Sequence, residues 1–122
     1  WQSEAPNGGF SETKPWLPVD PDHLPLAVDR QEEDPNSILA LTRRLIAFRK
    51  AHPALRTGSV TPLAVPAPLL AFERQGGGER LLCVFNLGRE TIDWPLPEGW
   101  RIIEAVGTGL EPASGYIAEW VG

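Results

Sequence analysis

The sequence predicts a mainly β protein, in which an irregular loop and one amphipathic helix precede a C-terminal antiparallel β-sandwich. Three observations support this prediction. Residues 1–33 are rich in turn-forming residues, residues 34–53 repeat apolar side chains at helical spacing, and residues 54–122 contain short apolar runs separated by turn signals. We therefore divide the chain after residue 53.

Composition and charge argue against two classes of function. The chain has 11 basic and 16 acidic residues, and its net charge of -5 is opposite to that of a nucleic-acid-binding surface. No apolar run approaches the roughly 18 residues that span a bilayer.

Cys83 is the single cysteine, so no disulfide forms within the chain, and we interpret it as a small buried hydrophobe. The lone cysteine and the lack of a secretion signal predict a cytoplasmic protein.

Residues 1–33 predict an irregular loop that packs against a larger body. Asn7-Gly8-Gly9 marks a tight turn, and four prolines interrupt any continuous helix or strand: Pro15, Pro18, Pro21 and Pro25. Several apolar side chains are too large for a solvated linker: Trp1, Phe10, Trp16 and Leu17. Because the chain opens on Trp1 and contains no methionine, we interpret it as a fragment that lacks part of that body.

The next segment predicts one helix over residues 34–52. Asp34 suits the N-cap, Pro35 suits the first helical position, and Pro53 disfavours helical geometry at the residue before it. Steps of about 100° per residue place the large apolar side chains on one wide face: Ile38, Leu39, Leu41, Leu45, Ile46 and Phe48. Such a face is typical of a helix packed on a large body.

Arg49 lies on this apolar face, and two interpretations stay open. Its guanidinium pairs with a buried carboxylate or carbonyl and fixes how the helix docks, or its stem lies along the core with the charged head in water.

Residues 54–122 predict six short strands, at 59–65, 69–74, 80–86, 91–94, 100–106 and 116–121. Pro62 indicates that the first of these is an edge strand. The continuous run Leu81-Leu82-Cys83-Val84-Phe85 predicts a central strand covered on both faces. Gly76-Gly77-Gly78 lies between two strands and is interpreted as a flexible hairpin, since no helix follows it to bind phosphate.

No catalytic, metal or cofactor site is predicted from the residues. A glycosidase needs two carboxylates that flank the scissile bond. The carboxylates here are explained by the loop, by helix capping or by strand ends. His23 and His52 lack the spacing of a metal-ligating pair, and His52 is interpreted as a structural cap. Four aromatic residues either form a sugar-binding platform or, as we favour, mostly fill the sandwich core: Trp94, Trp100, Tyr116 and Trp120.

Four segments, in this order, match the pattern of a known enzyme family. Trp1-Gln2 resembles the end of a Pro-Met-x-Trp motif on an eighth barrel strand. Asn7-Gly8-Gly9-Phe10-Ser11 and the following Lys14-Pro15-Trp16-Leu17-Pro18-Val19 are similar to a loop motif N-x-G-F-[ST] … P-W-[LI]-x-V. Residues 37–55 resemble the helix motif S-[IV]-[LF]-x-x-[YT]-[RK]-x-L-I-x-[LF]-R-K-x-[HN]-P-x-[LF]. The last segment, residues 82–86 and 110–117, resembles strands of an appended β-domain. Together these segments resemble the C-terminal end of α-glucosidases of glycoside hydrolase family 13, the oligo-1,6-glucosidase and α-amylase family.

This resemblance implies an architecture. Residues 1–53 would be the end of a catalytic (β/α)₈ barrel, with the loop after strand 8 and the last helix at about 34–52, and residues 54–122 would be the C-terminal β-sandwich domain. The family uses an Asp nucleophile, a Glu acid/base and a second Asp, all upstream of the eighth strand, so no catalytic residue is assigned here. The substrate-proximal positions would be Trp1, Asn7 and Phe10.

The function that the resemblance implies is that of a retaining α-glucosidase, which hydrolyses terminal α-linked glucose from short oligosaccharides. The enzyme as a whole would be a glycoside hydrolase, whereas this segment would be mainly structural. Its partners would be the α-glucoside substrate and the missing N-terminal part of the barrel. Two alternatives stay open: a relative of the sucrose isomerase or trehalose synthase type, and a non-catalytic carbohydrate-binding β-sandwich module.

Overall fold

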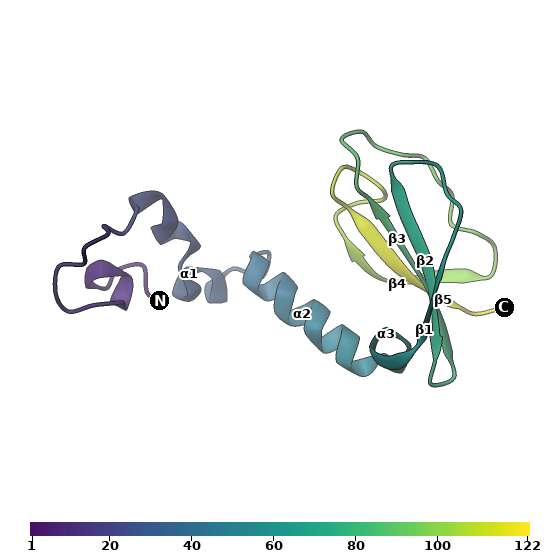
Figure 1. Ribbon diagram of the computed structural model, residues 1–122, viewed down its shortest axis with the longest axis horizontal. Helices are drawn as coiled ribbons and strands as arrows, with labels where there is room; N and C mark the ends of the chain where they lie inside the picture. Colours follow the sequence, from purple (N-terminus) through teal and green to yellow (C-terminus); the bar gives the residue numbers. More distant parts are fainter. The chain divides into compact units, whose positions relative to one another are not determined.

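The computed structural model describes residues 1–122 and divides them into two compact units, Trp1–Phe48 and Arg49–Gly122 (Figure 1). The first unit is helical and irregular, and the second is built on an antiparallel β-sheet. The predicted order of an irregular segment, a helix and an antiparallel β-domain is therefore confirmed. No helix is long and apolar enough to cross a membrane.

Residues 1–33 contain more local structure than the predicted loop. Two 3₁₀-helices, η1 (Pro6–Gly9) and η2 (Pro21–Leu26), precede the short α-helix α1 (Val28–Glu33). η1 and η2 each begin with a proline, whose fixed φ favours the first helical position. The Asp20 carboxylate caps η2 by accepting a hydrogen bond from the Asp22 amide at 3.0 Å. The prolines thus start short helical turns as well as interrupting longer ones.

The long helix α2 (Ile38–Ala51) begins later than predicted. Ser37 is the residue that caps it, because its Oγ accepts a hydrogen bond from the Ala40 amide at 3.1 Å. Asp34 instead accepts from the Asn36 amide at 2.8 Å and forms a turn between α1 and α2. The predicted end before Pro53 is confirmed, since Pro53 starts the next short helix, α3 (Pro53–Thr57).

The apolar face of α2 is not covered within this chain. Ile38 is 70% exposed, and no residue of the helix is buried. Arg49 is also exposed, so the two interpretations of its role remain predictions.

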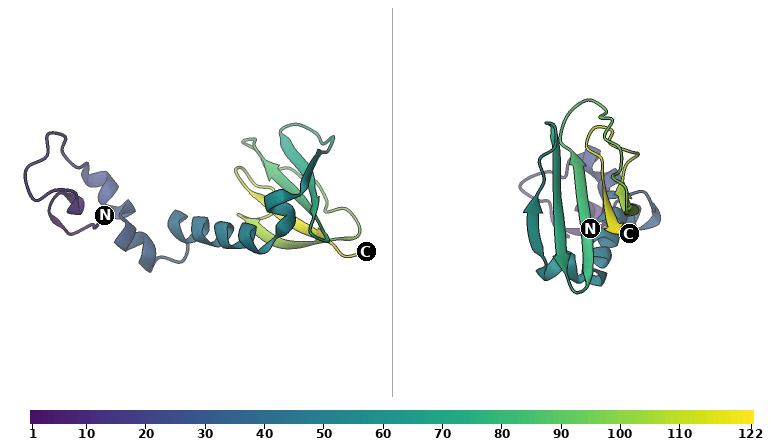
Figure 2. Two further views of the ribbon diagram at one scale, coloured as in Figure 1. Left: turned by 60° about the horizontal axis from the view of Figure 1, so that its bottom comes forward. Right: turned by 90° about the vertical axis from the view of Figure 1, so that its right-hand side faces the viewer.

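The second unit contains one five-stranded sheet in the order β1-β2-β3-β5-β4, with all neighbours antiparallel (Figure 2). Its strands are β1 (Ser59–Pro62), β2 (Leu69–Gly76), β3 (Glu79–Asn86), β4 (Trp100–Val106) and β5 (Gly115–Trp120). β3 is the central strand, as the continuous apolar run predicted, and β1 is an edge strand, as Pro62 indicated.

The predicted strand at 91–94 is wrong, and the β-domain is built on a single sheet. Residues 91–97 form a loop, in which Pro95 and Pro97 cannot donate ladder hydrogen bonds. Its apolar side chains nevertheless pack on one face of the sheet, where Ile92, Trp94 and Leu96 contact the core. That core comprises seven buried residues: Leu69, Ala71, Leu82, Val84, Leu110, Tyr116 and Ala118. Loops therefore form the layer that a second sheet would supply.

The Gly-rich hairpin is a two-residue turn with a packing requirement. Gly77 and Gly78 have φ of 63° and 83°, the left-handed values that such a turn needs. A Cβ on Gly77 would also lie 2.5 Å from the Cβ of Pro53. The glycines thus allow α3 to pack against this end of the sheet. Cys83 is buried as predicted, and desolvation raises the pKa of its thiol to about 11.

Candidate functional site

Two of the three predicted substrate-proximal residues form an aromatic pair. The rings of Trp1 and Phe10 are stacked, with centroids 5.8 Å apart and planes inclined by 27°. Gly8 lies between them with φ of 65°, and a Cβ there would come within 3.3 Å of the Trp1 ring. Phe10 is 71% exposed. The 3₁₀ turn η1 therefore presents an aromatic surface, and such a surface can pack on the C–H face of a sugar ring.

The third predicted residue, Asn7, closes the loop that carries this pair. Its backbone is left-handed, with φ of 54° and ψ of 31°, a conformation that asparagine tolerates better than most residues. Its side-chain amide donates hydrogen bonds to the carbonyls of Ser11 at 2.8 Å and Thr13 at 3.1 Å. Because both contacts are to backbone, the geometry of Asn7 is that of a positioning residue.

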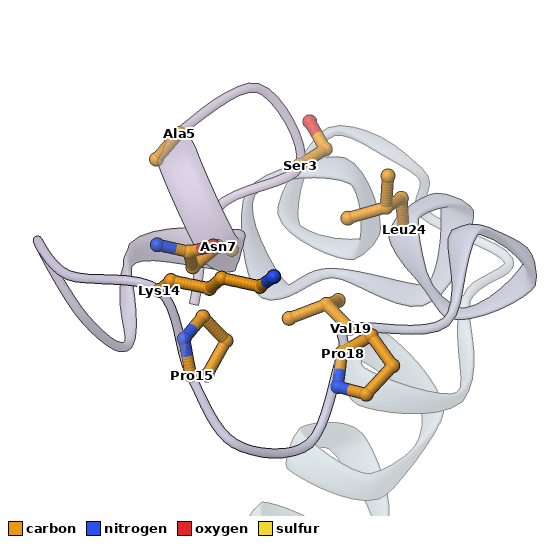
Figure 3. Close-up of a pocket in the computed structure, with 9 residues that line it drawn as sticks. Ser3, Ala5, Asn7, Lys14, Pro15, Pro18, Val19 and Leu24 are labelled. Carbon is orange, nitrogen blue, oxygen red and sulfur yellow. The ribbon is translucent and has the colours of Figure 1, made fainter.

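A cavity of about 390 Å³ lies beside the loop (Figure 3). Lys14 is the one charged side chain that lines it, and Figure 3 shows this side chain extended across the cavity. The remaining lining residues are small or apolar apart from Ser3 and Asn7: Ala5, Gly8, Pro15, Pro18, Val19 and Leu24. Sequence reasoning used Lys14 only as part of the loop motif. Lys14 and Arg30 are the only lysine and arginine among residues 1–33, and this scarcity of positive charge is a signal that could have marked Lys14 as a candidate site residue.

A polar network joins the start of the chain to α1. The Asp29 carboxylate accepts hydrogen bonds from the Ser3 amide and the Ser3 hydroxyl, each at 2.9 Å. The Ser3 amide is the main cause that lowers the pKa of Asp29. Arg30 adds a hydrogen bond to the Ser3 hydroxyl at 2.9 Å and an ion pair with Glu4 at 2.6 Å. A lowered pKa keeps Asp29 ionised, which is the reverse of what a general acid needs.

His52 takes part in a structural contact other than the predicted cap. Its Nδ1 lies 2.7 Å from Oε2 of Glu79, at the start of β3. The other oxygen of Glu79 accepts from the Ala54 amide at 3.3 Å in the first turn of α3. Glu79 rather than His52 therefore supplies the side-chain cap of α3. No group of three or more His, Cys, Asp and Glu side chains is close enough to hold a metal ion.

The four aromatic residues considered for a sugar platform are mostly core residues. Tyr116 is buried, and Trp94 and Trp100 pack against the core. Trp120 is exposed, but the Arg80 guanidinium lies 5.1 Å from its ring centroid and 5.2 Å from that of Trp100. Arg80 is itself paired with Glu73 at 2.7 Å, which raises the pKa of the arginine. The favoured interpretation of these aromatic residues as core is confirmed for three of them.

Two family models match the chain, and the two matches overlap over residues 55–58, at the end of α3. The model described as the catalytic domain of alpha amylase matches residues 1–58, and the model described as a domain of unknown function (DUF3459) matches residues 55–121. The second match alone covers more than half of the 122 residues.

Two known proteins match about four fifths of the chain. A probable alpha-glucosidase of Rhizobium meliloti (strain 1021) is 45% identical over 97 residues, which are 80% of this chain and 17% of that protein. The probable oligo-1,6-glucosidase 2 of Bacillus subtilis (strain 168) is 34% identical over 98 residues, 78% of this chain and 17% of that protein.

Solved structures match the fold. The structure of an alpha-glucosyl transfer enzyme has a TM-score of 0.84 at 34% identity, and the match covers 98% of this chain and 24% of that one. The trehalulose synthase of Pseudomonas mesoacidophila MX-45 has a TM-score of 0.78 at 30% identity, covering 97% and 24%. The chain thus spans about a sixth of the length of the curated relatives, 17% both for the Rhizobium meliloti protein and for the Bacillus subtilis protein. The motifs, the fold and these matches together show that the chain belongs to the α-amylase family, glycoside hydrolase family 13, and matches the C-terminal part of its members.

Proposed function

We propose that this chain is part of a retaining α-glucosidase that hydrolyses terminal α-linked glucose from short oligosaccharides. The observation that carries the proposal is the 45% identity, over 80% of the chain, to a protein named as a probable alpha-glucosidase. The match to the catalytic-domain model over residues 1–58 supports a direct connection to the active-site barrel.

The role of this segment within the enzyme is mainly structural. A retaining glycosidase needs a nucleophile and an acid/base whose carboxyl groups are about 5 Å apart. The carboxylates with short contacts here serve other purposes, because Glu73 and Glu119 pair with arginines and Asp29 holds Ser3. The chemistry is therefore assigned to residues outside these 122, and the uncovered apolar face of α2 packs on the rest of the barrel.

The aromatic pair of Trp1 and Phe10 is the part of this chain that contacts the sugar. The exposure of Phe10 and the left-handed turn that supports the pair favour this role. Asn7 holds the loop in shape, and the cavity with Lys14 borders the same turn. The substrate of the enzyme is an α-glucoside oligosaccharide.

A second candidate changes the reaction and keeps the fold. The structures of similar fold include a trehalulose synthase and an isomaltulose synthase in complex with its natural substrate sucrose, and a trehalose synthase of Thermus thermophilus is 42% identical over 72 residues. Because these relatives resemble this chain, the choice between hydrolysis and isomerisation is assigned to residues outside these 122.

The test is product analysis with the full-length protein that contains this chain. It is incubated with maltose, isomaltose and sucrose, and the sugars are separated by anion-exchange chromatography. Glucose release from maltose or isomaltose supports the hydrolase, whereas isomaltulose or trehalulose from sucrose, or trehalose from maltose, supports the second candidate. Turnover by the purified 122-residue chain, with its mass checked to exclude an upstream piece, would overturn the structural role assigned to its carboxylates.

A further inference from the structure

The start of the chain folds back on itself in a compact turn that carries the aromatic pair. The Gln2 amide donates a hydrogen bond to the Gly8 carbonyl at 3.0 Å, and the Gly8 amide donates to the Ala5 carbonyl at 2.9 Å. A Cβ on Gly8 would lie 3.3 Å from the Trp1 ring and 3.4 Å from the Phe10 ring. Because both rings pack on the backbone of this turn, the place of the turn decides the place of the pair.

The turn is anchored to α1 through Ser3. The Ser3 amide donates to both carboxylate oxygens of Asp29, at 3.1 and 2.9 Å, and the Ser3 hydroxyl donates to Oδ2 at 2.9 Å. Ser3 and Asp29 are 26 positions apart in the sequence. These three hydrogen bonds therefore fix the turn against a helix that is remote from it along the chain.

Asp29 anchors the turn more firmly than the neighbouring Arg30 does. Arg30 donates to the Ser3 hydroxyl and pairs with Glu4, but the side chains of Arg30 and Glu4 are 49% and 85% exposed. An ion pair so exposed contributes little and leaves both side chains mobile. The Asp29 carboxylate is only partly exposed and accepts charge-assisted hydrogen bonds from two donors of one residue, which restricts the orientation of that residue.

We infer that Asp29 is a positioning residue for the substrate site, and that through Ser3 it holds the turn where the Trp1–Phe10 pair meets the sugar. The inference rests on the proposed function, in that it takes this pair to contact the substrate. Asp29 itself does not touch the sugar. Dispersion contacts weaken steeply when a gap of 0.5–1 Å opens between the atoms, so a small displacement of the turn reduces the affinity for the substrate.

A positioning role and a purely structural role change different kinetic parameters. A stacking contact away from the reacting bond holds the substrate and the transition state about equally, so its loss raises KM and leaves kcat unchanged. A residue that only stabilised the fold would lower the melting temperature and the fraction of active enzyme. That loss would reduce the apparent kcat without changing KM.

The first test measures the kinetics of the full-length protein with maltose. We expect Asp29→Ala to raise KM about threefold or more with kcat within about twofold of the wild type. Ser3→Ala removes the hydroxyl but keeps the amide, and Asp29→Asn keeps the shape and one acceptor oxygen, so both should give intermediate KM values. Glu33→Gln removes an exposed carboxylate from the same helix and should change neither parameter. An unchanged KM in Asp29→Ala, or an equal rise in Glu33→Gln, would overturn the inference.

A double-mutant cycle asks whether Asp29 acts through the aromatic pair. Asp29→Ala is made in the wild type and in Phe10→Ala, and the two changes in KM are compared. Residues that act on one contact are not additive, so we expect the rise in KM to fall to less than about 1.5-fold once the Phe10 ring is absent. An equal rise in both backgrounds would mean that Asp29 affects the substrate by another route, and the positioning role would be wrong.

Hydrogen exchange of the full-length protein tests the anchor without any need for activity. We expect peptides from residues 1–10 to exchange faster in Asp29→Ala than in the wild type, while peptides from α2 exchange at the same rate in both. Equal exchange of residues 1–10 would refute the anchor. The proposed function fails separately, if the wild type releases no glucose from maltose or isomaltose. An active wild type whose KM is unaffected by Asp29→Ala would refute the positioning role alone.

Discussion

Asn86 at the end of β3 is the residue whose replacement should most strongly destabilise the β-domain. It is 1% exposed. Its side-chain amide donates to three backbone carbonyls, those of Glu90 at 2.7 Å, Leu110 at 2.8 Å and Glu111 at 3.2 Å. Its Oδ1 accepts from the Gly88 amide at 2.8 Å. One buried side chain thus joins the loop after β3 to the loop before β5.

The cost of Asn86→Ala follows from which groups lose their partner. The Leu110 carbonyl keeps a hydrogen bond from the Ile92 amide, and the Glu111 carbonyl keeps one from the Ser114 amide. The Glu90 carbonyl and the Gly88 amide lose the side-chain partner that they have here. At roughly 1–3 kcal/mol for each unsatisfied group, we expect a loss of about 3 kcal/mol in the free energy of unfolding.

Urea unfolding followed by far-ultraviolet circular dichroism measures this loss. Gln75→Ala, at an exposed strand position, is the matched control and should change stability by less than about 0.5 kcal/mol. Asn86→Asp keeps the acceptor for Gly88 but turns a second oxygen toward three carbonyls, so it should destabilise at least as much as alanine at neutral pH. If Asn86→Ala matched the control, or Asn86→Asp matched the wild type, the hydrogen-bond argument would be refuted.

Four further predictions concern other parts of the chain. Gly77→Ala should cost about 1–3 kcal/mol in urea unfolding, because the left-handed φ and the 2.5 Å approach to Pro53 both oppose a Cβ, whereas Gly78→Ala meets no atom within 4 Å and should cost less. Cys83 should fail to react with a disulfide reagent at pH 8 in the folded chain and react on unfolding, since its pKa of about 11 keeps the buried thiol protonated; reaction at the same rate in both states would contradict this. Asp29 has a lowered pKa when folded, so its contribution to stability is present above the ordinary aspartate pKa of 3.8 and is lost as the pH falls through the lower pKa of the folded state. Asp29→Asn should therefore reduce the acid dependence of unfolding in this range, and an unchanged pH profile would contradict the Ser3 contact. Phe10→Ala in the full-length protein should raise KM for maltose several-fold with the melting temperature unchanged, and an unchanged KM would remove the aromatic pair from the substrate site.

Local chemistry allowed several features to be predicted from the sequence. Pro53 ended the helix, the paired glycines formed the hairpin, and the uninterrupted apolar run of β3 took the centre of the sheet. Each depends on backbone preferences or burial that act within a few residues. The loop and helix motifs identified the family for the same reason, because they are continuous in sequence.

Only the tertiary structure decided the features in which nearly equal alternatives compete. Asp34 and Ser37 are both good N-caps, and Ser37 was selected while Asp34 formed the turn before it. Polar and apolar residues alternate over 91–94 as in a strand. The segment nevertheless packs on the core as a loop, because the following Pro95 and Pro97 cannot donate the backbone hydrogen bonds of a β-ladder.

In the candidate site, too, some features could be predicted from the sequence and others depend on the tertiary structure. The sequence motifs predicted Trp1 and Phe10 as substrate-proximal residues, but only the folded chain shows the stacking of their rings, the cavity beside Lys14 and the hydrogen bond from Ser3 to Asp29. The hydrogen bond from Arg74 to the Gly58 carbonyl is likewise visible only in the folded chain. Local preferences therefore determined where elements form, whereas long-range packing determined which side chains meet, since only the folded chain selects among partners of similar intrinsic strength.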